Sequence, residues 1–81
     1  MSVTYYVALA FIETPDGSAP AQAQECPSET IAMSTARGFA RQTGHVGAVG
    51  FKRTGDPDTG EFSDAVVIKT FGNVPEDLSG L

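Results

Sequence analysis

The sequence predicts an α+β domain in which one helix packs on one face of a three-stranded, mainly antiparallel sheet. Two observations carry this prediction: three stretches are rich in β-branched and aromatic residues, and one stretch between them has helical apolar spacing. The order is strand, helix, strand, strand within residues 1–72, and residues 73–81 are expected to form a C-terminal tail. A right-handed crossover gives 1-3-2 as the simplest strand order.

The first strand is predicted over residues 2–14, SVTYYVALAFIET, and is apolar on both faces. One face would carry Val3, Tyr5, Val7, Leu9 and Phe11, and the other Tyr6, Ala8, Ala10 and Ile12. A strand that is apolar on both sides is typically covered on both sides.

The connection after this strand, residues 15–27, is rich in Pro and Ala and has no clear periodicity. It is expected to be a loop. The alternative is a short edge strand that passes through Ala21, Ala23 and Cys26.

A helix is predicted before Gly44 because apolar residues recur there every three or four positions. Its buried stripe is expected to contain Ala32, Ala36, Phe39, Ala40 and Thr43, with Met33 at the margin. Ser34, Arg37 and Arg41 fall on the opposite, solvent-facing side. Gly38 also lies on the outer face, where glycine costs about 1 kcal/mol relative to alanine.

The second and third strands are predicted in HVGAVGFKRT (45–54) and EFSDAVVIKTF (61–71). Residues 56–60 between them, DPDTG, contain two acids, which raises the question of a calcium loop. A calcium loop needs ligands at positions 1, 3, 5 and 12 and glycine at position 6, and the register from Asp56 fails at positions 5, 6 and 12. Asp56, Pro57 and Gly60 are the residues that a tight turn uses, so a turn is predicted.

One helix covers only one face of this sheet, and the third strand is as two-sided as the first. The second apolar face therefore predicts a homodimer, in which sheet stacks on sheet or edge strands pair.

The chain of 81 residues has one cysteine and a formal net charge of −5. An acidic chain is an unfavourable partner for nucleic acid, so nucleic-acid binding is not expected. All five cations lie between residues 37 and 69, which suggests either a mixed solvated surface or a local basic patch. The unpaired thiol suits a reducing compartment, and no apolar stretch is long enough to span a bilayer; a cytoplasmic protein without membrane contact is expected.

Cys26 precedes the helix, and two N-terminal registers remain open. If Cys26 is the N-cap, the helix terminus would favour its thiolate; if Ser28 is the N-cap, Cys26 is a buried structural residue. His45, the only histidine, follows Gly44, where an imidazole interacts favourably with the helix C-terminus. GAVG, residues 47–50, lies within a strand, where glycine allows close packing by another backbone.

No catalytic residue, metal site or cofactor is predicted from these patterns. The candidate binding residues are Tyr6, Cys26, Arg37 and Arg41. Tyr5 and Tyr6 point to opposite faces, so one is expected in the core and the other at a pocket or interface.

YYVALAF, followed by a helix and a glycine-containing strand, resembles the opening of the peptidoglycan-binding SPOR domains. Those domains carry a second helix and a fourth strand, for which we expect no residues in this chain. The element order is also similar to half of a ferredoxin-like fold. Neither resemblance implies membership or function.

The sequence therefore predicts a small non-catalytic protein that acts through self-association or as an accessory module bound to another protein. The alternative is a small-molecule binder or simple enzyme, with its site at a subunit interface near Cys26 and residues 15–27. Weak nucleic-acid contact through Arg37, Arg41, Lys52 and Arg53 is a third, less favoured hypothesis.

Overall fold

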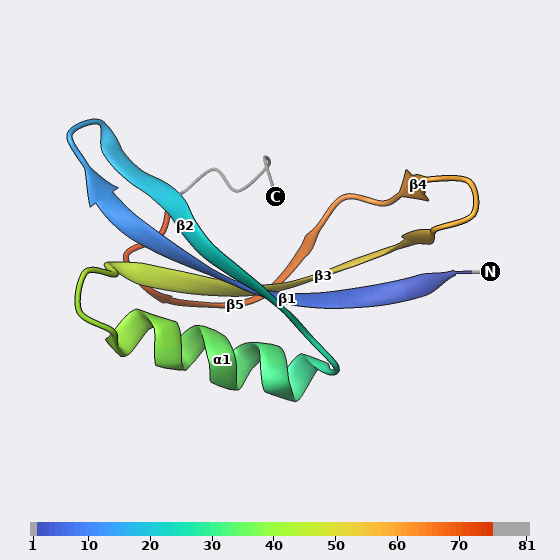
Figure 1. Cartoon of the computed structure of the whole chain (residues 1–81), viewed down its shortest axis with the longest axis horizontal. Helices are drawn as coiled ribbons and strands as arrows, with labels where there is room; N and C mark the ends of the chain where they lie inside the picture. The colour runs from blue at the N-terminus through green and yellow to red at the C-terminus, as the bar shows by residue number, and fades with distance from the viewer. Residues whose placement is uncertain (1, 76–81) are drawn as a thin grey trace.

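A computed structural model describes residues 2–75 and contains one helix and a curled antiparallel sheet that forms a half-barrel (Figure 1). The elements are β1 (Val3–Thr14), β2 (Gly17–Cys26), α1 (Glu29–Arg41), β3 (Gly47–Asp56), β4 (Glu61–Phe62) and β5 (Val66–Gly72). The strand order is β2-β1-β3-β4, and β5 also pairs with β3. The α+β class is confirmed. Residues 76–81 of the predicted tail lie outside the described residues.

The predicted strand order 1-3-2 is wrong. β1 pairs with β3 in antiparallel register from Val3 opposite Gly55 to Phe11 opposite Gly47, so the first strand and the strand after the helix are neighbours. The physical reason is β2, which reverses the chain before α1 begins. β3 therefore runs antiparallel to β1, and the rule for parallel crossovers does not apply.

The prediction of a loop over residues 15–27 is also wrong, because most of this segment is β2. Pro15 and Asp16 form a tight turn, and Gly17 follows with φ +132°. β2 then pairs with β1 as far as Tyr6 opposite Cys26. The alternative of a short edge strand is correct in predicting a strand here, but the observed strand, Gly17–Cys26, is longer than predicted. The expectation that this chain has no residues for a fourth strand is therefore wrong.

The helix begins as the Ser28 register predicts. The Ser28 side chain accepts a hydrogen bond from the Ile31 amide at 3.2 Å, so Ser28, not Cys26, is the N-cap. Ala32, Ala36 and Phe39 are the buried residues of α1, which confirms the centre of the predicted stripe. The small side chains of Ala32 and Ala36 allow α1 to lie close to β1, β3 and β5 (Figure 1).

Two apolar clusters lie on the two faces of the sheet. Beneath α1 the buried cluster contains Ala8, Ala10, Cys26, Ala32, Ala36, Phe39 and Ala48. On the other face the buried residues are Leu9, Phe11, Val49 and Phe51. The second cluster is at most 9% exposed within a single chain, with Val74 and Ala65 packed against it. The end of this face near Tyr5 and Phe62 is open.

The turn at residues 56–60 is confirmed. The Gly60 amide donates to the Asp56 carbonyl at 2.8 Å, and the Asp58 amide donates to Asp56 Oδ1 at 2.9 Å. Gly60 has φ +76°, the left-handed conformation that glycine adopts readily. The turn joins β3 to β4, so the acidic segment has a structural explanation.

Two glycines of β3 allow close backbone approach, as predicted. A Cβ at Gly47 would overlap the backbone carbonyl of Asn73, and a Cβ at Gly50 would lie 3.5 Å from the Ala32 carbonyl oxygen of α1. These positions bring the C-terminal segment and the helix, respectively, against β3.

We therefore expect the same substitution to have opposite effects at two glycines. Gly47→Ala should lower the free energy of unfolding by about 1–3 kcal/mol, because the new methyl group has no space. Gly38→Ala should raise it by about 1 kcal/mol, because Gly38 is helical and nothing lies within 4 Å of the added Cβ. Urea unfolding of both variants measures the difference, and a destabilised Gly38→Ala or an unaffected Gly47→Ala would contradict this packing.

Candidate functional site

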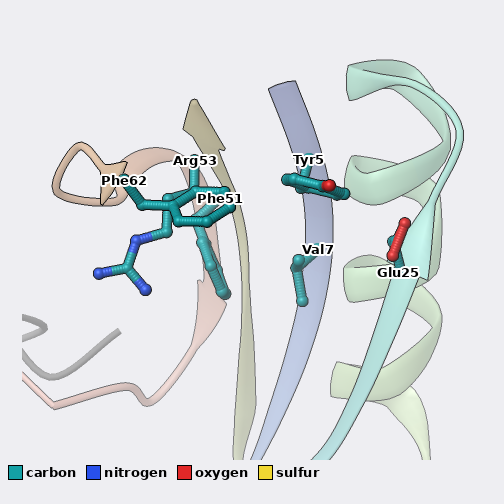
Figure 2. Close-up of a pocket in the computed structure, with 6 residues that line it drawn as sticks. All are labelled: Tyr5, Val7, Glu25, Phe51, Arg53 and Phe62. Atoms are coloured by element: carbon teal, nitrogen blue, oxygen red, sulfur yellow. The ribbon is translucent and has the colours of Figure 1, made fainter. Parts of the chain in front are cut away.

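The strongest candidate site is an apolar cleft on the sheet face that α1 does not cover. It has a volume of about 370 Å³ and is lined by residues of four strands: Tyr5, Val7, Glu25, Phe51, Arg53 and Phe62. Figure 2 shows Tyr5 and Val7 between Glu25 of β2 on one side and Phe51, Arg53 and Phe62 on the other.

The floor of the cleft follows directly from strand register. Alternate residues of β1 point to this face, and Val7 is paired with Phe51 of β3 on one side and with Glu25 of β2 on the other. Tyr5 is paired with Arg53 in the same way. The floor is therefore a row of cross-strand neighbours that the sheet holds rigidly in place.

The wall of the cleft is the ring of Phe62 on β4. Phe62 is opposite Gly55 of β3, and a Cβ at Gly55 would overlap that ring. The missing side chain lets Phe62 lie against the sheet, where its ring centroid is 5.8 Å from that of Tyr5 at a tilt of 46°. Phe62 is still 42% exposed, so its ring offers apolar surface to a ligand or partner.

The two sides of the cleft carry opposite charges. Arg53 Nε donates to the Ser63 carbonyl at 2.9 Å, which fixes the guanidinium beside the segment that follows β4. Glu25 lies on β2, across Tyr5 and Val7 from Arg53 (Figure 2). The site can therefore hold an apolar group of a ligand or partner, while Arg53 on one side and Glu25 on the other interact with charged groups next to it.

Two of the predicted binding residues, Tyr6 and Cys26, are brought together, but beneath the helix. They are direct cross-strand partners in β1 and β2, and Tyr6 packs against the cluster that includes Cys26. The Cys26 thiol is 5% exposed and lies 3.5 Å from the Gln24 carbonyl oxygen and 3.7 Å from Thr35 Oγ1. This position is the buried structural one that the Ser28 register implied.

The other two predicted residues, Arg37 and Arg41, are exposed on α1. The Arg37 guanidinium lies 5.9 Å from the ring centroid of Phe71 on β5. Cys26 is on β2 at the opposite edge of the sheet, with β1 and β3 between them. The four predicted residues therefore do not form one site.

The prediction that the two tyrosines face opposite sides is confirmed. Tyr6 packs in the core under α1, whereas Tyr5 lines the cleft. Tyr6 was the nominated binding residue, because the alternating pattern alone does not reveal which face the helix covers. Phe62 and Glu25 gave no sequence signal, since their place in the cleft depends on the pairing of β4 and β2.

His45 has the structural position that the sequence suggested. Its Nδ1 is 2.9 Å from the Phe39 carbonyl oxygen, and its ring stands edge-on to the Phe39 ring at 6.1 Å. A carbonyl oxygen only accepts, so Nδ1 carries the proton in this contact. The ring thus adds a second hydrogen bond to a carbonyl near the C-terminal end of α1, which also accepts from the Gln42 amide at 3.1 Å.

Residues 2–75 contain no group of three or more His, Cys, Asp or Glu side chains placed to hold a metal ion. Within the same range, no helix has the length and apolarity needed to cross a membrane. Comparisons of the chain with protein-family models, with curated proteins and with solved structures found no match.

The buried position of Cys26 gives a direct chemical prediction. Alkylation of the folded protein by iodoacetamide should be at least about tenfold slower than alkylation in urea, because reaction requires local opening. The control is Ala23→Cys in a Cys26→Ala background, which places a thiol at an exposed position of the same strand. Equal rates for Cys26 and the control would contradict burial.

Proposed function

We propose that the protein is a small non-catalytic interaction module that forms a homodimer through its apolar cleft. The observation that supports this proposal is the combination of exposed aromatic surface and oppositely charged sides in one cleft. Burial of the aromatic surface on binding is favourable, and the two charges favour one orientation of the partner.

A second copy of the chain fits this cleft by symmetry. A twofold axis brings the same patch of both subunits together, so that a residue pair across the interface occurs twice. With the axis through the cleft, Arg53 meets Glu25 of the partner subunit, and Glu25 meets the partner subunit's Arg53. The Tyr5 and Phe62 rings of both copies then lie in the apolar centre.

The strength of this dimer is expected to be modest. The open apolar part of the face consists of the few side chains that line the cleft, because Leu9, Phe11 and Val49 are already buried within the chain. Interfaces below about 1,200 Å² are typical of weak and transient association. A dissociation constant in the micromolar range is therefore expected.

Charge reversal tests the orientation of the two subunits. Arg53→Glu and Glu25→Arg should each weaken the dimer at least about tenfold, because each places like charges across the interface. The double variant Arg53→Glu/Glu25→Arg should restore wild-type affinity, because both pairs are re-formed with exchanged signs. Sedimentation equilibrium over a micromolar dilution series measures all four proteins.

The apolar centre has its own matched control. Phe62→Glu should leave only monomer, whereas Val66→Glu, which changes an apolar residue outside the cleft that is exposed to a greater extent, should dimerise normally. Circular dichroism establishes that each variant folds. A wild-type protein that remains an 8.4 kDa monomer at several hundred micromolar, or a double variant no better than the single ones, would refute the proposed dimer.

A small apolar ligand is the second candidate occupant, because the cleft volume of about 370 Å³ falls within the usual range for ligand pockets. Saturable, one-to-one binding of an apolar fluorescent dye to the monomeric protein, lost in Phe62→Glu, would favour this alternative. The site would be the cleft on the open face, not the surroundings of Cys26.

A further inference from the structure

A group of cations lies at the other edge of the sheet, on the helix-covered side. Lys69 and Phe71 are alternate residues of β5, and Arg37 and Arg41 are one turn apart on α1. Arg37 and Lys69 both lie over the Phe71 ring, at 5.9 Å and 5.6 Å from its centroid. We call Arg37, Arg41, Lys69 and Phe71 the basic edge.

The cations of the basic edge have no carboxylate partner among the described residues. The ion pair recorded within residues 2–75 joins Lys52 Nζ to Glu29 Oε1 at 3.9 Å, and Arg53 donates to the Ser63 carbonyl. Arg37 and Lys69 thus meet at Phe71, with Arg41 one turn further along α1, and within residues 2–75 no carboxylate is paired with any of the three. The Arg37 guanidinium and the Lys69 ammonium lie over the Phe71 ring, a cation–π contact that favours their position beside β5 before an anion binds.

The backbone beside these cations is also available. β5 pairs with β3 alone among the described strands, so alternate N–H and C=O groups of β5 point away from the sheet. The neighbouring side chains Val66 and Val67 are 55% and 40% exposed. The edge therefore combines free hydrogen-bonding groups, apolar surface and positive charge.

We propose that β5 binds an extended, acidic segment of a protein partner, which adds to the sheet as a further strand. Main-chain hydrogen bonds to β5 would supply affinity. Alternate side chains of the added strand would lie on the helix-covered side, where Asp or Glu residues meet Lys69, Arg37 and Arg41. This site is separate from the cleft, so the same molecule can use both.

The charge of the chain favours a peptide over a nucleic acid at this edge. Nucleic-acid affinity grows with the number of phosphates neutralised, and the basic edge supplies three cations on a chain of net charge −5. Pairing of β5 with β5 of a second copy is disfavoured, because it would bring two sets of three cations together. A short acidic strand matches both the edge and its charge.

The test uses a fluorescein-labelled peptide of five Thr-Glu repeats, which is extended and carries its carboxylates on one side. Fluorescence polarisation with the full chain should show saturable binding that weakens as salt is added. A peptide of five Thr-Gln repeats should bind at least about tenfold more weakly, because the charge-assisted hydrogen bonds are lost.

Arg37→Gln/Lys69→Gln should weaken binding of the Thr-Glu peptide at least about tenfold. The control is Lys52→Gln, which removes a cation that is already paired and should bind the peptide within about twofold of wild type. Two further peptides carry N-methyl groups on the Thr or on the Glu residues. One of them should lose binding, because one set of amides faces β5.

Four results would overturn the proposal: no binding of the Thr-Glu peptide at millimolar concentration, equal losses in Lys52→Gln and the double variant, full binding of both N-methylated peptides, or tighter binding of a single-stranded oligonucleotide. A monomeric Phe62→Glu variant should still bind the peptide, so failure of the cleft dimer and failure of this site are distinguishable.

Discussion

The structure of residues 2–75 depends on one constraint: a sheet with two apolar faces has one helix to cover it. The contact of α1 with the sheet is built from small side chains on both sides, with Ala32 and Ala36 of the helix above Ala8, Ala10 and Ala48 of the strands. Alanine against alanine brings the helix close to the backbone, and Gly50 reduces the separation further. Phe39 supplies most of the bulk in this layer. The larger apolar residues of β1 and β3 are consequently left for the opposite face.

Where the sheet curls, the chain's own residues bury that opposite face. Where the curl ends, the face is open. Leu9, Phe11 and Val49 are buried inside the half-barrel without help from another chain. At the far end, Gly55 makes room for the Phe62 ring, and the same strands present Tyr5 and Phe51 around an open cleft. The cleft is thus the part of the apolar face that the curled sheet leaves exposed. For this reason it is the site of the proposed association. The basic edge lies on the helix-covered side of the sheet, so the two proposed sites are on different surfaces of the molecule.

Local patterns were sufficient for the elements with a marked apolar pattern and for the turn that needs particular residues. The alanine stripe of α1, the two-sided apolar character of β1 and the turn at 56–60 were all predicted correctly. β2 was missed because nine of its ten residues are not buried, so no burial pattern is imposed on its Ala and Gln side chains. The strand order was wrong for the same reason, since β2 sets the direction of everything after it. The cleft was missed because cross-strand register, which the sequence does not reveal, brings Glu25 and Phe62 to Tyr5.

The most direct test of the account compares the two adjacent tyrosines, which lie on opposite faces of β1. Tyr6 is partly buried and packs against the apolar cluster beneath α1, whereas Tyr5 faces the cleft where a partner subunit is proposed. Fluorine NMR of protein labelled with 3-fluorotyrosine follows both rings during dilution from millimolar to micromolar concentration. The account predicts that the Tyr5 resonance shifts with concentration while the Tyr6 resonance stays constant. Two resonances that are both constant over the whole range, or that shift together, would contradict it.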